Sequence, residues 1–206
     1  MNQNQFLNFI PKNSHRYIKK IVDYDNLEIR VVKKRKSKHG DYRLLKSGQN
    51  LITINATKNP FRFLITLIHE LSHFRVIKNF SYPVLPHGKE WKETFKKMIL
   101  PLLNNSVFPE NILSKLAKHM INPRATTDTD EDLIICLSKY DINKDDKVFL
   151  TEIGINKLFK YSNERIFKKN DKLRKRYICQ EVSTGKKYLF SPVAKVKKVI
   201  YENCSS

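Results

Sequence analysis

Apolar and polar positions follow two different periods along this chain. Residues 27–32 alternate with a period of two, which predicts a β-strand. Residues 41–45 and 51–54 predict two further strands, and the intervening Lys46-Ser47-Gly48-Gln49 is typical of a hairpin turn. Helical spacing of apolar residues instead predicts four α-helices, over residues 14–23, 89–103, 109–120 and 133–140.

A largely apolar stretch follows Asn59 and Pro60, which favour a helix start because Asn caps a helix and Pro fits its first position. Its apolar side chains would lie on more than one side of the helix, so the helix should be buried: Leu64, Ile65, Leu67, Ile68, Leu71 and Phe74. One polar stripe interrupts this surface, formed by Arg62, Thr66, His69, Glu70 and His73. Because buried polar groups need partners, the stripe indicates a bound ligand.

The stripe contains the motif His-Glu-x-x-His, at His69-Glu70-Leu71-Ser72-His73. Residues four apart lie on one face of a helix, so His69 and His73 can bind the same Zn²⁺. Glu70 would then lie beside the metal, where its carboxylate can take a proton from water. Two histidines do not complete a zinc site, which needs a third protein ligand.

His87, which lies fourteen residues after His73, is the candidate third ligand. Pro83 and Pro86 bring the chain in as an extended turn, and Gly88 allows a close backbone approach. Some zinc peptidases with the His-Glu-x-x-His motif (zincins) use a glutamate as the third ligand. Glu90 and Glu93 are therefore alternatives to His87. His119 lies near the end of a predicted helix and is expected at the surface.

A His-Glu-x-x-His helix followed by His87-Gly88-x-x-Trp91 resembles the SprT-like zinc metalloproteases, a family that includes Spartan. The resemblance covers about residues 10–120. It is strongest to bacterial SprT-like domain proteins of the Bacteroidetes type, on the sequences that flank the motif: Asn-Pro-Phe-Arg-Phe-Leu-Ile-Thr-Leu before it and Trp-Lys-x-Thr-Phe after it. It implies an α+β zincin-like fold, in which a small sheet packs on helices. It also implies His69, His73 and His87 as zinc ligands and Glu70 as the catalytic acid and base.

The same resemblance implies a peptidase whose substrates are proteins bound or crosslinked to DNA. Tyr82 lies in the loop where a second donor to the oxyanion is expected, but the sequence does not assign that role. Two rival interpretations stay open: a peptidase without a nucleic-acid role, and a DNA-binding protein with a structural or idle zinc site. Glu70 argues against an idle site, because a purely structural zinc site needs no carboxylate there.

Residues 156–206 predict a small, basic, β-rich C-terminal unit. Residues 156–200 carry fourteen Lys and Arg against three Asp and Glu, and short strands are predicted at 157–161, 165–169, 174–181, 186–190 and 193–200. Many SprT-like proteins end in a zinc ribbon, but here Cys179 is alone and Val182 stands where its partner would be. We therefore expect a unit that resembles a zinc ribbon without the metal, with its aromatic residues mostly in the core and its lysines available to phosphates.

These patterns predict three parts: a protease domain at 1–122, a linker with a short helix at 123–155, and the C-terminal unit at 156–206. The net charge of +20 favours a polyanionic partner, with DNA as the first candidate, although the excess of Lys over Arg also fits a compositional bias. The basic run from Lys33 to Lys38 is either a second phosphate contact or a solvated loop.

The cysteines predict a reducing compartment. Cys136, Cys179 and Cys204 are far apart and form no Cys-x-x-Cys pair, which argues against a disulfide framework. The N-terminal residues lack the basic start and apolar run of a signal peptide, and no stretch reaches the roughly twenty apolar residues of a membrane span. We therefore expect a cytoplasmic protein, associated with the nucleoid if it binds DNA, and no membrane partner.

Overall fold

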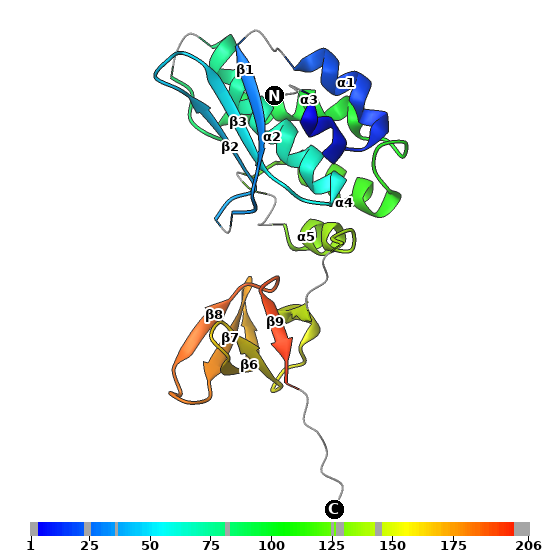
Figure 1. The fold of residues 1–206 in the computed structure, drawn as a ribbon. Coiled ribbons are helices and arrows are strands. Elements are labelled where there is room, and N and C mark those ends of the chain that lie inside the picture. Colours follow the sequence, from blue (N-terminus) through cyan, green and yellow to red (C-terminus); the bar gives the residue numbers. More distant parts are fainter. Residues whose placement is uncertain are drawn as a thin grey trace, which may run out of the picture. The chain divides into compact units, whose positions relative to one another are not determined.

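The computed structural model describes residues 4–22, 26–35, 37–80, 83–124, 126, 130–142 and 146–199. The chain divides into two compact units, a first unit at Met1–Ile142 and a second unit at Asn143–Ser206. Helices and two separate sheets make this a mixed α+β protein, as the sequence predicts (Figure 1).

The first unit contains a three-stranded sheet whose strands lie in the order β1-β3-β2. Strand β1 (Leu27–Val32) runs parallel to β3 (Asn50–Asn55), and β2 (Gly40–Leu44) runs antiparallel to β3. The predicted hairpin therefore joins β2 to β3, and Gly48 in its turn has a positive φ of 81°. Strand β2 is an edge strand, with one side free of any strand neighbour in the described part of the chain.

Helix α2 (Pro60–Asn79) is the long buried helix that the sequence predicts. The side chain of Asn59 accepts a hydrogen bond from the backbone N–H of Arg62, so Asn59 is the N-cap and Pro60 stands at the first helical position. The helix packs against β2, β3 and α3. None of the described helices, α2 included, combines the length and apolar character that crossing a membrane requires.

The first unit has further helical segments (Figure 1): η1 (Gln5–Phe9), η2 (Lys12–Ser14), α1 (His15–Ile21), α3 (Lys89–Ile99), η3 (Leu100–Leu102), α4 (Glu110–Ile121) and α5 (Glu131–Ser138). Each of the four helices predicted by helical spacing is present. Helix α5 packs on α4 and contributes Leu133, Cys136 and Leu137 to the core. The first unit thus continues past residue 122, where the sequence placed its end, because the apolar face of α5 is buried there.

The second unit is a six-stranded sheet in the order β4-β9-β5-β6-β7-β8, with every neighbouring pair antiparallel. Its strands and short helix are β4 (Lys147–Phe149), η5 (Leu150–Glu152), β5 (Leu158–Tyr161), β6 (Arg165–Leu173), β7 (Arg176–Glu181), β8 (Lys187–Phe190) and β9 (Lys195–Lys198). Five strands overlap the predicted ones, whereas β4 was not predicted because it has only three residues. With β4 and η5, the unit takes in residues that were predicted as linker.

Aromatic side chains form most of the second unit's core. Phe159, Phe167 and Phe190 pack on one another with ring centroids 5.0–5.7 Å apart, and Cys179 is fully buried among them. Among the aromatic residues of this unit that the structure describes, Tyr161 is the most exposed, with 41 % of its surface exposed. In the described part of this unit no three His, Cys, Asp or Glu side chains converge on a common point. A six-stranded sheet with its own core is also larger than the small ribbon that was predicted.

Candidate metal centre

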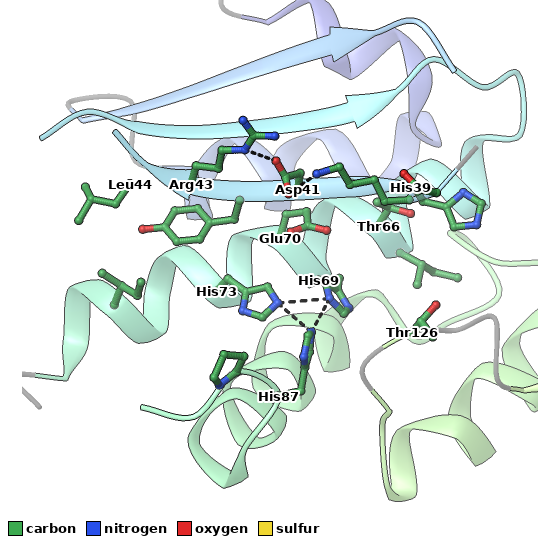
Figure 2. Close-up of a pocket in the computed structure, with 17 residues that line it drawn as sticks. His39, Asp41, Arg43, Leu44, Thr66, His69, Glu70, His73, His87 and Thr126 are labelled. Atoms are coloured by element: carbon green, nitrogen blue, oxygen red, sulfur yellow. Dashed lines mark hydrogen bonds and ion pairs between the residues drawn. The ribbon is translucent and has the colours of Figure 1, made fainter. Parts of the chain in front are cut away.

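Three imidazoles converge beside α2 (Figure 2). His69 and His73 come from successive turns of the helix, and His87 comes from the loop before α3. Their Nε2 atoms are 3.3 Å (His69 to His73), 3.2 Å (His69 to His87) and 3.0 Å (His73 to His87) apart. Two nitrogens bound to zinc at about 2.0–2.1 Å and at a tetrahedral angle lie about 3.3–3.4 Å apart, so this triangle fits one metal ion.

The histidines are in the protonation state that binds a metal. Burial lowers the pKa of His69 to about 3, with smaller contributions from His73 and His87, and burial followed by His87 lowers the pKa of His73 to about 4. Burial also lowers the pKa of His87. All three are therefore neutral near pH 7 and present lone pairs. One shared cation would satisfy three converging nitrogens that cannot all hydrogen bond to one another.

His87 reaches the cluster through an unusual backbone conformation. Its φ is +60°, in the left-handed region that non-glycine residues seldom adopt. The turn that contains His87 is closed by a hydrogen bond from the N–H of Gly88 to the carbonyl of Leu85, and α3 begins directly after it. Within the described ranges the cluster consists of the three histidines, and neither Glu90 nor Glu93 belongs to it.

Trp91 forms the floor under the histidines. It is fully buried, and its ring centroid lies 4.6 Å from His69, 5.3 Å from His73 and 4.7 Å from His87. The sequence led us to expect a core residue that supports His87, and the tryptophan packs on all three rings. This packing limits their rotation, which keeps the three nitrogens in position.

Glu70 lies in the same cleft and is only 7 % exposed. Burial, followed by the charge of Asp41, raises the pKa of Glu70 to about 8, and Arg35, Lys38 and a hydrogen bond from the backbone N–H of Tyr42 oppose this rise. Near pH 7 the carboxyl group is therefore mostly protonated when no other charge is close. A nearby cation stabilises the ionised form, so a bound metal would lower this pKa.

Gly40, the first residue of β2, makes the approach of β2 to Glu70 possible. A Cβ atom at this position would lie 2.6 Å from Oε1 of Glu70 and 2.7 Å from Cγ2 of Thr66. Any side chain would therefore displace the carboxyl group. Nothing in the sequence distinguished this glycine from an ordinary loop glycine after a basic run.

The basic run before Gly40 is partly tied to the protein. Arg35 donates hydrogen bonds to Asn55 Oδ1 (2.8 Å) and Thr53 Oγ1 (3.0 Å), and Lys38 pairs with Asp41 at 2.7 Å. Asp41 also pairs with Arg43. These contacts hold the strand that covers Glu70. Two cations of the basic run, which the sequence left open as a phosphate contact or a solvated loop, therefore have a structural role.

A cleft of about 700 Å³ runs along the centre, between β2 and α2. Its walls include the three histidines, Glu70, and Lys38, Ile65, Thr66 and Pro86, which the sequence analysis named in other contexts. The remaining lining residues were not proposed for the site: Ser37, His39, Gly40, Asp41, Tyr42, Arg43, Leu44, Ile77 and Thr126. Tyr82, considered above as an oxyanion donor, lies outside the described residues. Long-range pairing of β2 with α2 forms the cleft, which no local sequence pattern reveals.

His119 corrects an expectation. It is 5 % exposed, not at the surface, and its Nδ1 lies 3.0 Å from Oδ2 of Asp130, which also caps α5 through a hydrogen bond to the N–H of Leu133. The packing of α5 on α4 buries this histidine.

Comparisons of the chain with models of known protein families, with curated proteins and with solved structures gave no match. The arguments for function therefore come from the residues and their geometry.

Proposed function

We propose that the protein is a zinc-dependent metalloendopeptidase with a zincin-like fold of the SprT-like type, and that it cleaves proteins bound or crosslinked to DNA. One observation carries the proposal. Three neutral imidazoles meet with their Nε2 atoms 3.0–3.3 Å apart, in a cleft that also contains the carboxyl group of Glu70. Three histidine ligands with one open position are typical of catalytic zinc sites.

His69, His73 and His87 would hold the zinc ion. When bound, zinc supplies Lewis acidity, which polarises a carbonyl group and lowers the pKa of water toward about 7. Glu70 takes the proton from the attacking water and passes it to the leaving amine, because its carboxyl group lines the cleft that contains the histidines. Asp41 also lines the cleft, but its carboxylate is paired with Lys38 and Arg43. The N–H of Tyr42 and the close approach of Gly40 fix the orientation of this carboxyl group.

The open edge of β2 favours the proposal of a protein substrate that binds in an extended conformation. An exposed sheet edge can accept an extended peptide as an additional strand, which binds main chain without reading its sequence. Strand β2 lines the cleft along most of its length, so a chain added there would pass the histidines and Glu70.

The charge of the second unit supports DNA as the recruiting partner. Lys168 of β6 lies opposite Gln180 of β7, which lies opposite Lys187 of β8, so the two exposed lysines share the face of the sheet away from its aromatic core. Because the core takes up most of the aromatic rings, phosphate contacts rather than base stacking would provide the affinity. Such binding should depend little on sequence and fall steeply with salt.

The test of the chemistry is proteolysis of a DNA-binding protein by the full-length chain. We expect cleavage that stops when a chelator removes zinc and returns when zinc is added back. If the zinc-loaded protein cleaves none of a broad set of denatured and DNA-bound proteins, the peptidase proposal is wrong.

The test of the DNA partner compares cleavage with and without single- and double-stranded DNA over a range of salt concentrations. We expect DNA to stimulate cleavage at low salt, and Lys168→Ala combined with Lys187→Ala to weaken both DNA binding and stimulation. Lys19→Ala combined with Lys20→Ala, which removes two exposed lysines from α1, is the matched control. Cleavage that is the same with and without DNA at every salt concentration would favour the peptidase without a nucleic-acid role.

A further inference from the structure

Two exposed aliphatic side chains lie at one end of the cleft. Leu44 at the end of β2 is 55 % exposed, and Ile77 in the last turns of α2 is 52 % exposed. Single exposed aliphatic residues are common on protein surfaces and need no explanation. Leu44 and Ile77 differ from scattered residues because both line the cleft that contains the candidate metal centre.

The positions of both residues follow from those of the site. Ile77 comes four residues after His73 and therefore lies on the same face of α2, one turn further along. Leu44 comes two residues after Tyr42 and lies on the same face of β2. The ring of Tyr42 stacks parallel to that of His73, with centroids 6.5 Å apart. Leu44 thus extends the β2 wall of the cleft by two residues beyond Tyr42, and Ile77 extends the α2 wall by one turn beyond His73. Figure 2 shows Leu44 at the end of the cleft away from His39 and Thr126.

The hydrogen bonds of β2 show which of its residues can bind another chain. The carbonyl of His39 accepts from the N–H of Asn55, and the N–H of Leu45 donates to the carbonyl of Gln49. In an antiparallel pair this pattern alternates, so the odd-numbered residues of β2 bond to β3 and the backbone groups of Gly40, Tyr42 and Leu44 point to the open edge. The hydrogen bond from the N–H of Tyr42 to Glu70 agrees with this assignment. Because Glu70 occupies that N–H, an added chain would pair mainly with the backbone groups of Gly40 and Leu44.

The direction of β2 then decides which part of a substrate meets Leu44 and Ile77. Strand β2 runs from Gly40, beside Glu70, to Leu44. An added antiparallel chain, the more stable pairing, would run in the opposite direction. Its residues before the scissile bond would lie along Leu44 and Ile77, and its residues after that bond would lie toward Lys38 and Thr66.

We propose that Leu44 and Ile77 form a subsite for an aliphatic or aromatic side chain on the N-terminal side of the scissile bond. This inference rests on the proposed peptidase function. The opposite end of the cleft carries the polar side chains of Lys38, His39 and Thr66, so the apolar preference is confined to one side of the bond.

The experiment is a cleavage-site map made with the zinc-loaded, full-length protein. The probe is a peptide library made by tryptic digestion of a bacterial lysate, and mass spectrometry identifies the new ends. We expect Leu, Ile, Met and Phe to be enriched within the few residues before the scissile bond. Leu44→Ser and Ile77→Ser should lower kcat/KM for such peptides by about tenfold, the lower end of what one hydrophobic contact contributes to specificity.

Two further variants sharpen the map. Ile77→Lys should replace the apolar preference by a preference for Asp and Glu at the same substrate position. Leu100→Ser is the matched control, because Leu100 is 68 % exposed but does not line the cleft, and it should leave the map unchanged. Uniform cleavage without an apolar preference, or a preference confined to the C-terminal side of the bond, would overturn the subsite while leaving the peptidase function intact.

A binding measurement separates the subsite from the catalytic proposal. A labelled Gly/Ser-rich peptide with a single Leu should bind the Glu70→Gln protein more tightly than the same peptide with Ser in place of Leu, and Leu44→Ser should remove the difference. If no substrate is cleaved but this difference exists, the peptidase proposal fails, and with it the assignment to one side of a scissile bond, while the binding of an apolar side chain at Leu44 stands. If neither cleavage nor the binding difference is observed, both proposals fail.

Discussion

The two units of this protein bury ionisable side chains in contrasting ways. In the second unit Lys169 is 2 % exposed and Glu181 is 4 % exposed, and in the first unit Glu70 is 7 % exposed. Burying a charge is unfavourable unless the protein supplies partners. The difference between the units lies in how completely those partners are supplied.

The second unit provides full sets of partners. The ammonium group of Lys169 donates to the carbonyls of Leu150 and Ile153 and lies 3.8 Å from the ring centroid of Tyr177. The carboxylate of Glu181 accepts hydrogen bonds from Arg165 and Thr184, each at 2.6 Å. These groups are saturated, so we assign them to the stability of the sheet.

The candidate site of the first unit leaves its buried groups without full sets of partners, although His119 in the same unit is paired with Asp130. Glu70 accepts a backbone hydrogen bond from Tyr42 and otherwise lines the cleft, next to three histidine nitrogens that point at one another (Figure 2). A site that binds a metal ion and a substrate requires polar atoms beside a cleft whose bonding partners the protein itself does not fully supply. Burial of an ionisable group alone therefore does not indicate a functional site, whereas burial without a full set of hydrogen-bond partners does.

The largest expected effect is that of Glu70→Gln. The amide cannot accept a proton, so kcat/KM for peptide cleavage should fall by about 10²–10⁴-fold, while zinc content and circular dichroism stay unchanged. Glu181→Gln is the matched control, because it alters a buried carboxylate of the second unit and should leave kcat/KM at the wild-type value. Wild-type activity in the Glu70→Gln protein would remove Glu70 from the mechanism.

The next effect concerns the metal. His87→Ala should weaken zinc binding by more than about 100-fold, since even partners of metal ligands contribute 10–100-fold. Zinc per chain is measured by atomic absorption after dialysis. Glu90→Ala and Glu93→Ala test the two carboxylates that the sequence left open and should keep the metal. Loss of zinc in either of these, with zinc retained in His87→Ala, would show that the third ligand is wrong.

Sequence patterns predicted the local parts of this picture well. The period-two strands, the cap at Asn59 and the apolar helix around His69 and His73 are all present, because local periodicity and capping determine them. The role of Gly40 could not be predicted, because it depends on the pairing of β2 with distant residues. The division between units was also misplaced, since the positions of α5 and β4 are decided by packing and not by their own sequences.

Gly40→Ala tests the close approach that the sequence missed. The added Cβ would lie 2.6 Å from Oε1 and 2.8 Å from Cγ of Glu70, so the carboxyl group must move. A displacement of about 1 Å in a catalytic group can cost on the order of 100-fold, and we expect kcat/KM to fall by about ten- to a hundredfold. Gly154→Ala is the control, because its Cβ would meet only Cγ of Lys157 at 3.4 Å. Unchanged activity in Gly40→Ala would show that Glu70 is not held by this contact.

Lys169→Met tests the hydrogen bonds of the buried ammonium group in the second unit. The change keeps the length of the side chain but leaves the carbonyls of Leu150 and Ile153 without their donor, which should destabilise the second unit by about 1–3 kcal/mol. Chemical denaturation followed by hydrogen exchange in β6 and β7 measures the loss. Lys168→Met, at the neighbouring exposed position, should change stability by less than about 0.5 kcal/mol. Equal effects of the two substitutions would mean that the buried ammonium group adds nothing to the sheet.

The smallest expected effect is the acid dependence of the second unit. The hydrogen bond from Arg165, followed by that from Thr184, lowers the pKa of Glu181 from 4.5 to about 2. A carboxyl group with a lowered folded-state pKa stabilises the fold above its unfolded pKa, so this contribution is complete above about pH 4.5 and is lost as the pH falls toward 2. Glu181→Gln should remove this part of the acid dependence in thermal unfolding followed by circular dichroism. His69 and His73 of the first unit, with pKa values of about 3 and about 4, titrate in an overlapping range. Trp91 is the only tryptophan in the chain and lies in that unit. Its fluorescence therefore reports the first unit separately, and a change confined to the Trp91 signal would place the acid-sensitive group outside the second unit.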